Sequence, residues 1–167
     1  MITSIVYLII SFLLENIMSN IFPSYLGQTS YFTTIYTIIA LSIIYPYFIS
    51  EKKYFILVVI FGILFDITYT STFIVNLVLF LIVGIIIKLL NNIMNNNIFM
   101  SNIISIITIT IYHILTFIIL NINNYNYSFN LLLNIITHSL IMTIIYTTIS
   151  YIIINHIFNK KENRGIK

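Results

Sequence analysis

Residues Tyr54 to Ile87 read YFILVVIFGILFDITYTSTFIVNLVLFLIVGIII and contain a single charged residue, Asp66. At about 1.5 Å of rise per residue, this run is too long for one crossing of a ~30 Å hydrocarbon core. The polar residues Thr70, Ser71 and Thr72 divide it into two short crossings. A charge inside hydrocarbon is costly, so Asp66 is expected to face protein or water and to mark a functional site. The stretch therefore predicts a helical hairpin in a membrane.

The whole chain has the composition of a membrane protein. Its 167 residues are 60% hydrophobic and only 7% charged, with a mean hydropathy of +1.07. Ordinary soluble domains carry about 25% charged residues, so this composition excludes a water-soluble fold. Six spans would leave roughly 47 residues for loops and tails, too few for a soluble catalytic domain. The absence of cysteine excludes disulfides and thiolate metal sites.

Breaks of recognisable chemistry separate six apolar segments. A loop with proline and glycine follows the first, the charged residues Glu51 to Lys53 follow the second, and two later breaks are rich in asparagine. Runs such as Ile103 to Leu120 are too long for the alternating strands of a membrane barrel. We therefore predict an all-α bundle of six transmembrane helices, over residues 3–22, 31–50, 54–70, 72–90, 101–120 and 131–157. They form one domain, residues 1–158, followed by a short basic cytoplasmic tail, 159–167.

The basic residues predict the orientation of this bundle. Lys52 and Lys53 lie between the second and third segments, Lys88 ends the fourth, and the other four follow the sixth. With six spans, all seven fall on one side, and the opposite loops carry no charge. Because lysine and arginine collect in cytoplasmic loops, both termini are predicted to be cytoplasmic. Outside the short tail no clustered basic surface is present, so nucleic-acid binding is not expected.

Four ionisable side chains fall at a similar predicted depth in the outer half of the membrane: Glu15, Asp66, His113 and His138. A carboxylate beside an imidazole lowers the cost of burying either group. Three interpretations of this intramembrane polar cluster remain open. It is a clamp between helices or a set of separate contacts to water, a proton or ion relay, or a site for a substrate or a partner helix.

Small and polar residues mark the faces on which helices are expected to meet. Gly62 lies one turn before Asp66, and Asn76 and Gly84 share a stripe of the following segment. Small residues let membrane helices approach closely, so these three are candidates for helix packing or for a partner-binding face. No catalytic, cofactor-binding or metal-binding residue is predicted, because the chain has no HExxH motif and no glycine-rich phosphate loop. The sequence therefore predicts a protein that is not an enzyme.

The segment from Glu51 to Thr70 resembles the third span of the rod shape-determining protein MreD family. The resemblance lies in a glycine, an aromatic-Asp pair (Phe65-Asp66) and a polar turn. The first span is similar as well, with its intramembrane Glu15 and its Phe-Pro exit. After Asp66 the family often has glycines, where this chain has Ser71, Thr72 and Ile74.

The resemblance implies a non-enzymatic scaffold or regulator of bacterial cell-wall elongation and cell shape in the cytoplasmic membrane. Its expected partner is the single-span protein MreC, with links to the MreB filament, the glycosyltransferase RodA and a penicillin-binding transpeptidase. The resemblance also implies a fold like that of the substrate-binding subunits of energy-coupling-factor transporters. A small-molecule-binding transporter subunit is therefore the alternative, although short, Asn-rich outer loops favour the scaffold. A subunit of an ion or proton pathway is a third possibility.

Overall fold

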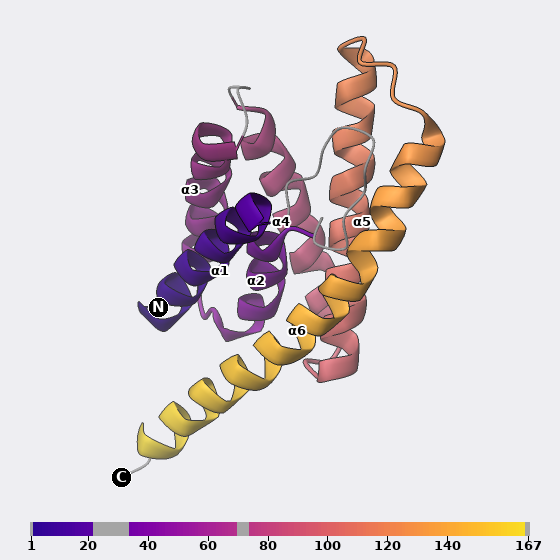
Figure 1. Ribbon diagram of the computed structural model, residues 1–167. Helices are drawn as coiled ribbons and strands as arrows, with labels where there is room; N and C mark the ends of the chain where they lie inside the picture. Colours follow the sequence, from indigo (N-terminus) through magenta and orange to yellow (C-terminus); the bar gives the residue numbers. More distant parts are fainter. Residues whose placement is uncertain (1, 22–33, 70–73, 166–167) are drawn as a thin grey trace.

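The computed structural model describes residues 2–21, 34–69 and 74–165, and these residues are all-helical, without a strand. The helices are α1 (Ile2–Ile21), α2 (Tyr36–Ile44), the 3-10 helix η1 (Tyr45–Tyr47), α3 (Glu51–Tyr69), α4 (Val75–Ile93), α5 (Ile98–Ile122) and α6 (Phe129–Gly165) (Figure 1). The all-α class predicted from the sequence is confirmed for these ranges. The predicted loop at Pro23 to Gln28 and the polar turn at 70–72 lie outside the described residues.

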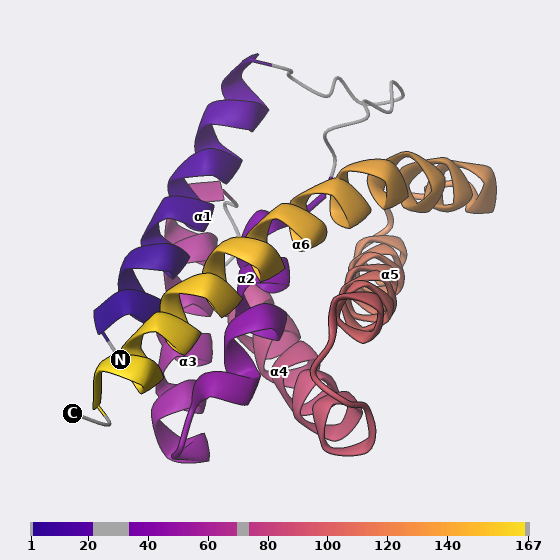
Figure 2. The ribbon, with the colours of Figure 1, turned by 90° about the horizontal axis from the view of Figure 1, so that it is seen from below.

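The short helix α2 lies at the centre of the bundle. All nine of its residues are buried, and it contacts α1, α4, α5 and α6. Figure 2 shows it beneath α6, with α1 on one side. The helix is shorter than the segment 31–50 expected from hydropathy, because η1 follows with Pro46 in its first turn. Proline has no N–H to donate and disrupts a continuing α-helix, so the chain tightens and turns there.

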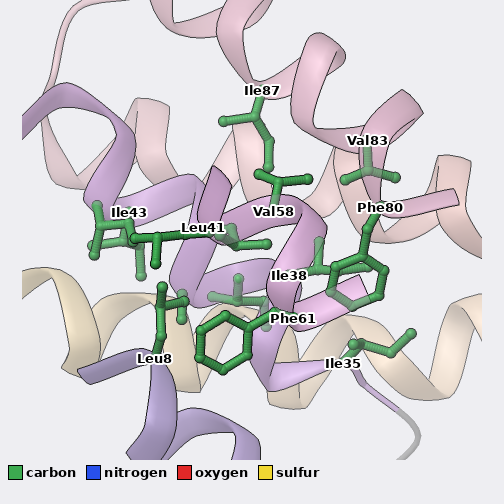
Figure 3. Packing of buried hydrophobic residues seen from close by; sticks show 14 of the residues in the cluster. Leu8, Ile35, Ile38, Leu41, Ile43, Val58, Phe61, Phe80, Val83 and Ile87 are labelled. Carbon is green, nitrogen blue, oxygen red and sulfur yellow. The ribbon is translucent and has the colours of Figure 1, made fainter. Parts of the chain in front are cut away.

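The core is formed by aliphatic and aromatic side chains, most of them from α1 to α4, with Ile109 and Tyr112 of α5 and Ile154 of α6. Figure 3 shows ten of them labelled: Leu8, Ile35, Ile38, Leu41, Ile43, Val58, Phe61, Phe80, Val83 and Ile87. The opposite faces of the helices expose large aliphatic side chains, among them Ile10, Ile63 and Ile85. In lipid, apolar burial gives no hydrophobic gain, so close van der Waals packing holds such a core together.

Two helical hairpins, α3–α4 and α5–α6, pack around α2. The long helix α6 crosses the other helices (Figures 1 and 2). Its C-terminal part contacts η1. The Tyr47 ring stacks on Phe158 at 4.4 Å, and the Tyr47 hydroxyl donates to Asn155 Oδ1 at 3.3 Å. Residues 159–165, expected as a tail, continue the same helix. Basic residues in a last helical turn are favourable because they face the negative end of the helix dipole.

Among the described residues, three helices are long and apolar enough to cross a membrane: Val75–Ile93, Ile98–Ile122 and Phe129–Phe158. Thr3–Met18 and Tyr36–Tyr47 are shorter apolar helices. Helix α3 has 19 residues and begins with the charged residues Glu51, Lys52 and Lys53. The described part of the chain thus has the character of a membrane protein.

Candidate functional site

Asp66 belongs to α3, but its carboxylate lies against the first turn of α4. It supplies the N-terminal cap that α4 does not have from its own residues. The residue before α4 is Ile74, which has a φ of 75° and no polar side chain for capping. Asp66 Oδ1 accepts from the backbone N–H of Asn76 at 2.9 Å, and Oδ2 accepts from that of Leu77 at 3.0 Å. The first N–H groups of a helix have no partner within it, and the positive end of the helix dipole favours an anion. The buried carboxylate is therefore well matched to its surroundings.

Asn76 and Tyr112 extend this contact to a third helix. The Asn76 amide Nδ2 donates to Asp66 Oδ1 at 3.1 Å, and the Tyr112 hydroxyl donates to Asn76 Oδ1 at 2.7 Å. All three side chains are buried. Asp66, Asn76 and Tyr112, which we call the polar triad, thus join α3, α4 and α5.

Glu15 makes an equivalent contact at the start of α2. Its Oε2 accepts from the Thr37 hydroxyl at 2.8 Å and from the Thr37 backbone N–H at 3.4 Å. Thr37 is the second residue of α2. Ile35, the N-cap residue before this helix, has no side-chain acceptor. Glu15 is buried, like Asp66. Glu15 and Asp66 therefore each cap the helix that follows their own.

A further hydrogen bond ties α3 to α1, the helix that carries Glu15. The Tyr69 hydroxyl donates its proton to the Phe12 carbonyl at 2.9 Å.

The two histidines of the predicted cluster make different contacts. His113 follows Tyr112 on α5, and the two rings meet edge to face at 5.9 Å. Its Nε2 is buried and has no hydrogen-bond partner. His138 Nδ1 lies 2.7 Å from the Asn134 carbonyl of its own helix. Within the described ranges, no group of three His, Asp or Glu side chains could hold a metal ion.

Gly62, Asn76 and Gly84 all lie inside the contact between α3 and α4. A Cβ atom on Gly62 would come within 2.9 Å of Leu77 Cα, and one on Gly84 within 3.2 Å of the Val58 side chain. Both glycines therefore let the two helices approach closely. Gly62 does so beside Leu77, whose backbone N–H Asp66 binds.

Three hydroxyl pairs connect the remaining helices. Ser11 Oγ lies 2.8 Å from the Tyr146 hydroxyl, Thr34 Oγ1 lies 2.7 Å from Thr143 Oγ1, and Ser42 Oγ lies 2.9 Å from Ser105 Oγ. They link α1 to α6, the entry of α2 to α6, and α2 to α5. The serine and threonine faces of these helices thus point inward.

The sequence does not single out Thr37, and it does not predict that Asn76 binds Asp66. A signal for Thr37 exists, since a threonine near the start of an apolar segment is typical of a helix N-terminus. No local signal points from Thr37 to Glu15, because 22 positions separate them. Compared with protein-family models, curated proteins and solved structures, the chain matches none.

Proposed function

We propose that this protein is a non-enzymatic membrane scaffold of bacterial cell-wall elongation, of the MreD type. The observation that carries the proposal is the use of both intramembrane carboxylates as helix caps. Asp66 and Glu15 bind backbone N–H groups at fixed positions. Such contacts stabilise one arrangement of the helices, as a scaffold requires, rather than presenting a reactive group to a substrate.

The same observation counts against the transporter alternative. In many transporters a half-helix begins inside the membrane, and its positive N-terminal end binds an anionic group of the substrate. Here α2 is such a short buried helix, but Glu15 already occupies its start, and Asp66 occupies that of α4. An anionic ligand would have to displace a carboxylate of the protein itself.

The proposed architecture is a bundle of six spans similar to the energy-coupling-factor substrate-binding subunit fold, with both termini on the cytoplasmic side of the bacterial inner membrane. An ion pair supports the placement of two basic segments on the same side of the membrane. Lys88 Nζ lies 2.6 Å from Glu51 Oε2, which brings the end of α4 beside the start of α3. The proposed partner is an MreC-like single-span protein, which would link the scaffold to MreB, RodA and the transpeptidase.

The test is reconstitution of a defined pair. The full chain, tagged, is co-expressed with an MreC-type single-span protein of the same genome and purified in mild detergent. We expect the two to elute together, whereas an unrelated single-span protein of equal helix length should not. Equilibrium dialysis of the purified chain against labelled riboflavin, thiamine and biotin should show no saturable binding. Saturable vitamin binding without co-elution would replace the scaffold by the transporter subunit.

A further inference from the structure

Within the described residues, the start of α3 carries more positive than negative charge. Lys52 and Lys53 are exposed in the first turn of the helix. The adjacent acid, Glu51, is bound by Lys88 at 2.6 Å, so this ion pair cancels the one negative charge of the segment. One acid and three lysines leave a net charge of +2 here. An anion approaching Lys52 and Lys53 therefore meets no unpaired carboxylate on this turn.

Helix stability does not explain these lysines. The N-terminal end of a helix carries the positive end of its dipole, where cations are unfavourable and anions are favourable. Two adjacent lysines at this end add to the positive potential instead of balancing it. Their position favours contact with an external negative charge.

An exposed apolar side chain stands directly beside them. Ile49, between η1 and α3, is fully exposed, at 106% of its reference area. At the boundary of a bilayer, such a side chain enters the acyl region, while lysine stems extend outward and place their ammonium groups among the headgroups. Ile49, Lys52 and Lys53, which we call the inner corner, thus combine an apolar anchor with two cations.

The fold brings a second basic segment to the same place. Through the Tyr47–Phe158 stack, η1 holds the part of α6 that precedes Lys160 and Lys161. Residues about 100 positions apart in the sequence therefore converge on this end of the molecule. Neither segment alone shows this convergence in the sequence.

We propose that the inner corner binds the phosphate headgroup of an anionic phospholipid, such as phosphatidylglycerol. The lysines pair with the phosphate, and Ile49 packs against the acyl chains of the same lipid. This inference rests on the membrane character of the chain and does not depend on the scaffold role. An anionic membrane surface attracts each nearby basic residue strongly enough to raise binding roughly fivefold.

The chain contains no tryptophan, which allows a direct test. The full-length variant Ile49→Trp carries a single tryptophan, at the inner corner, and is reconstituted into vesicles that contain brominated lipid as a quencher of tryptophan fluorescence. Brominated phosphatidylglycerol should bind at this position at least fivefold more strongly than brominated phosphatidylcholine. The preference should fall to near unity when Lys52→Gln and Lys53→Gln are added, and it should persist with Lys52→Arg and Lys53→Arg.

The matched control uses the other end of the same helix. Ile67 is also apolar and exposed, at 70%, and Ile67→Trp should be quenched equally by both lipids. Equal quenching at position 49, an equal preference at position 67, or a preference that survives the glutamine substitutions would each overturn the proposal. Loss of the preference on adding inorganic phosphate at constant ionic strength would assign the lysines to a soluble anion instead.

Discussion

A single residue, Asp66, shows how this protein holds a charge where charge is costly. Its two oxygens accept two backbone N–H groups and one amide N–H. Hydrogen bonds to an ionised group are about twice as strong as neutral ones. The three donors would otherwise be unpartnered in a dry interior, so the acid and the helix start stabilise each other.

Substitution of Asp66 should therefore lower stability in proportion to the hydrogen bonds that are lost. Asp66→Leu leaves buried donors without acceptors and should cost about 3 kcal/mol. Asp66→Asn keeps one acceptor oxygen and should cost about 1 kcal/mol. Unfolding titrations with SDS in mixed micelles measure both values.

The control for Asp66 is Thr68→Val, on an exposed position of the same helix. The Thr68 hydroxyl bonds only within its helix, to the Leu64 carbonyl. Its replacement should change stability by no more than about 0.5 kcal/mol. Equal losses of stability for Thr68→Val and Asp66→Leu would contradict the stabilising role of the capping hydrogen bonds.

Tyr112 tests whether the polar triad acts as a unit. Tyr112→Phe keeps the ring but removes the hydroxyl that donates to Asn76 Oδ1, and should cost about 1 kcal/mol. In the Asp66→Leu background the same change should cost less, because Asn76 has already lost the acceptor of its own amide. A double-mutant cycle measures this coupling, and strictly additive losses would contradict it.

At the scale of the element, the two glycines of the α3–α4 hairpin predict different tolerance. A Cβ on Gly62 meets backbone, Leu77 Cα, at 2.9 Å, whereas a Cβ on Gly84 meets the side chains of Val58 and Phe55 at 3.2 Å or more. Backbone cannot move without separating the helices, but side chains can give by a few tenths of an ångström.

Gly62→Ala should therefore destabilise the bundle, and Gly84→Ala should not. Overpacking at Gly62 costs about 1–3 kcal/mol, more than the ~1 kcal/mol that alanine gains over glycine in a helix. At Gly84 the two effects should nearly cancel. The same SDS titration compares them, and a greater loss for Gly84→Ala would contradict the packing described here.

The helices were largely predictable from the sequence, but their roles were not. Uninterrupted apolar runs identify α4 and α5, whose observed bounds lie within a few residues of those expected. The shortening of α2 depends on Pro46 and on enclosure by four other helices, which hydropathy does not record. Glu15 and Asp66 stand out in the sequence as acids within apolar segments, yet their partners, Thr37 and Asn76, become visible only when the helices pack.

At the scale of the whole molecule, the placement of charge predicts the topology. The ion pair between Glu51 and Lys88 marks one end of the bundle, and the uncharged Tyr125 loop between α5 and α6 marks the other. Since the chain has no cysteine, a single introduced cysteine reports on which side of the membrane its position lies. In intact cells, Tyr125→Cys should react with an impermeant thiol reagent, whereas Asn95→Cys should react only after lysis.

Both substituted positions are exposed in the structure, so burial does not explain a difference between them. Reaction of Asn95→Cys from outside intact cells would reverse the orientation. Reaction of both variants before lysis would show that α5 does not cross the membrane.

The order of the capping residues along the chain has a consequence for biogenesis. Glu15 precedes the start of α2, and Asp66 precedes the start of α4. Chains are synthesised from the N-terminus, so each carboxylate leaves the ribosome before the N–H groups that it will accept. A short helix such as α2, which has no cap of its own, then meets its acceptor as it emerges. In both contacts, translation thus delivers the acceptor before the donors.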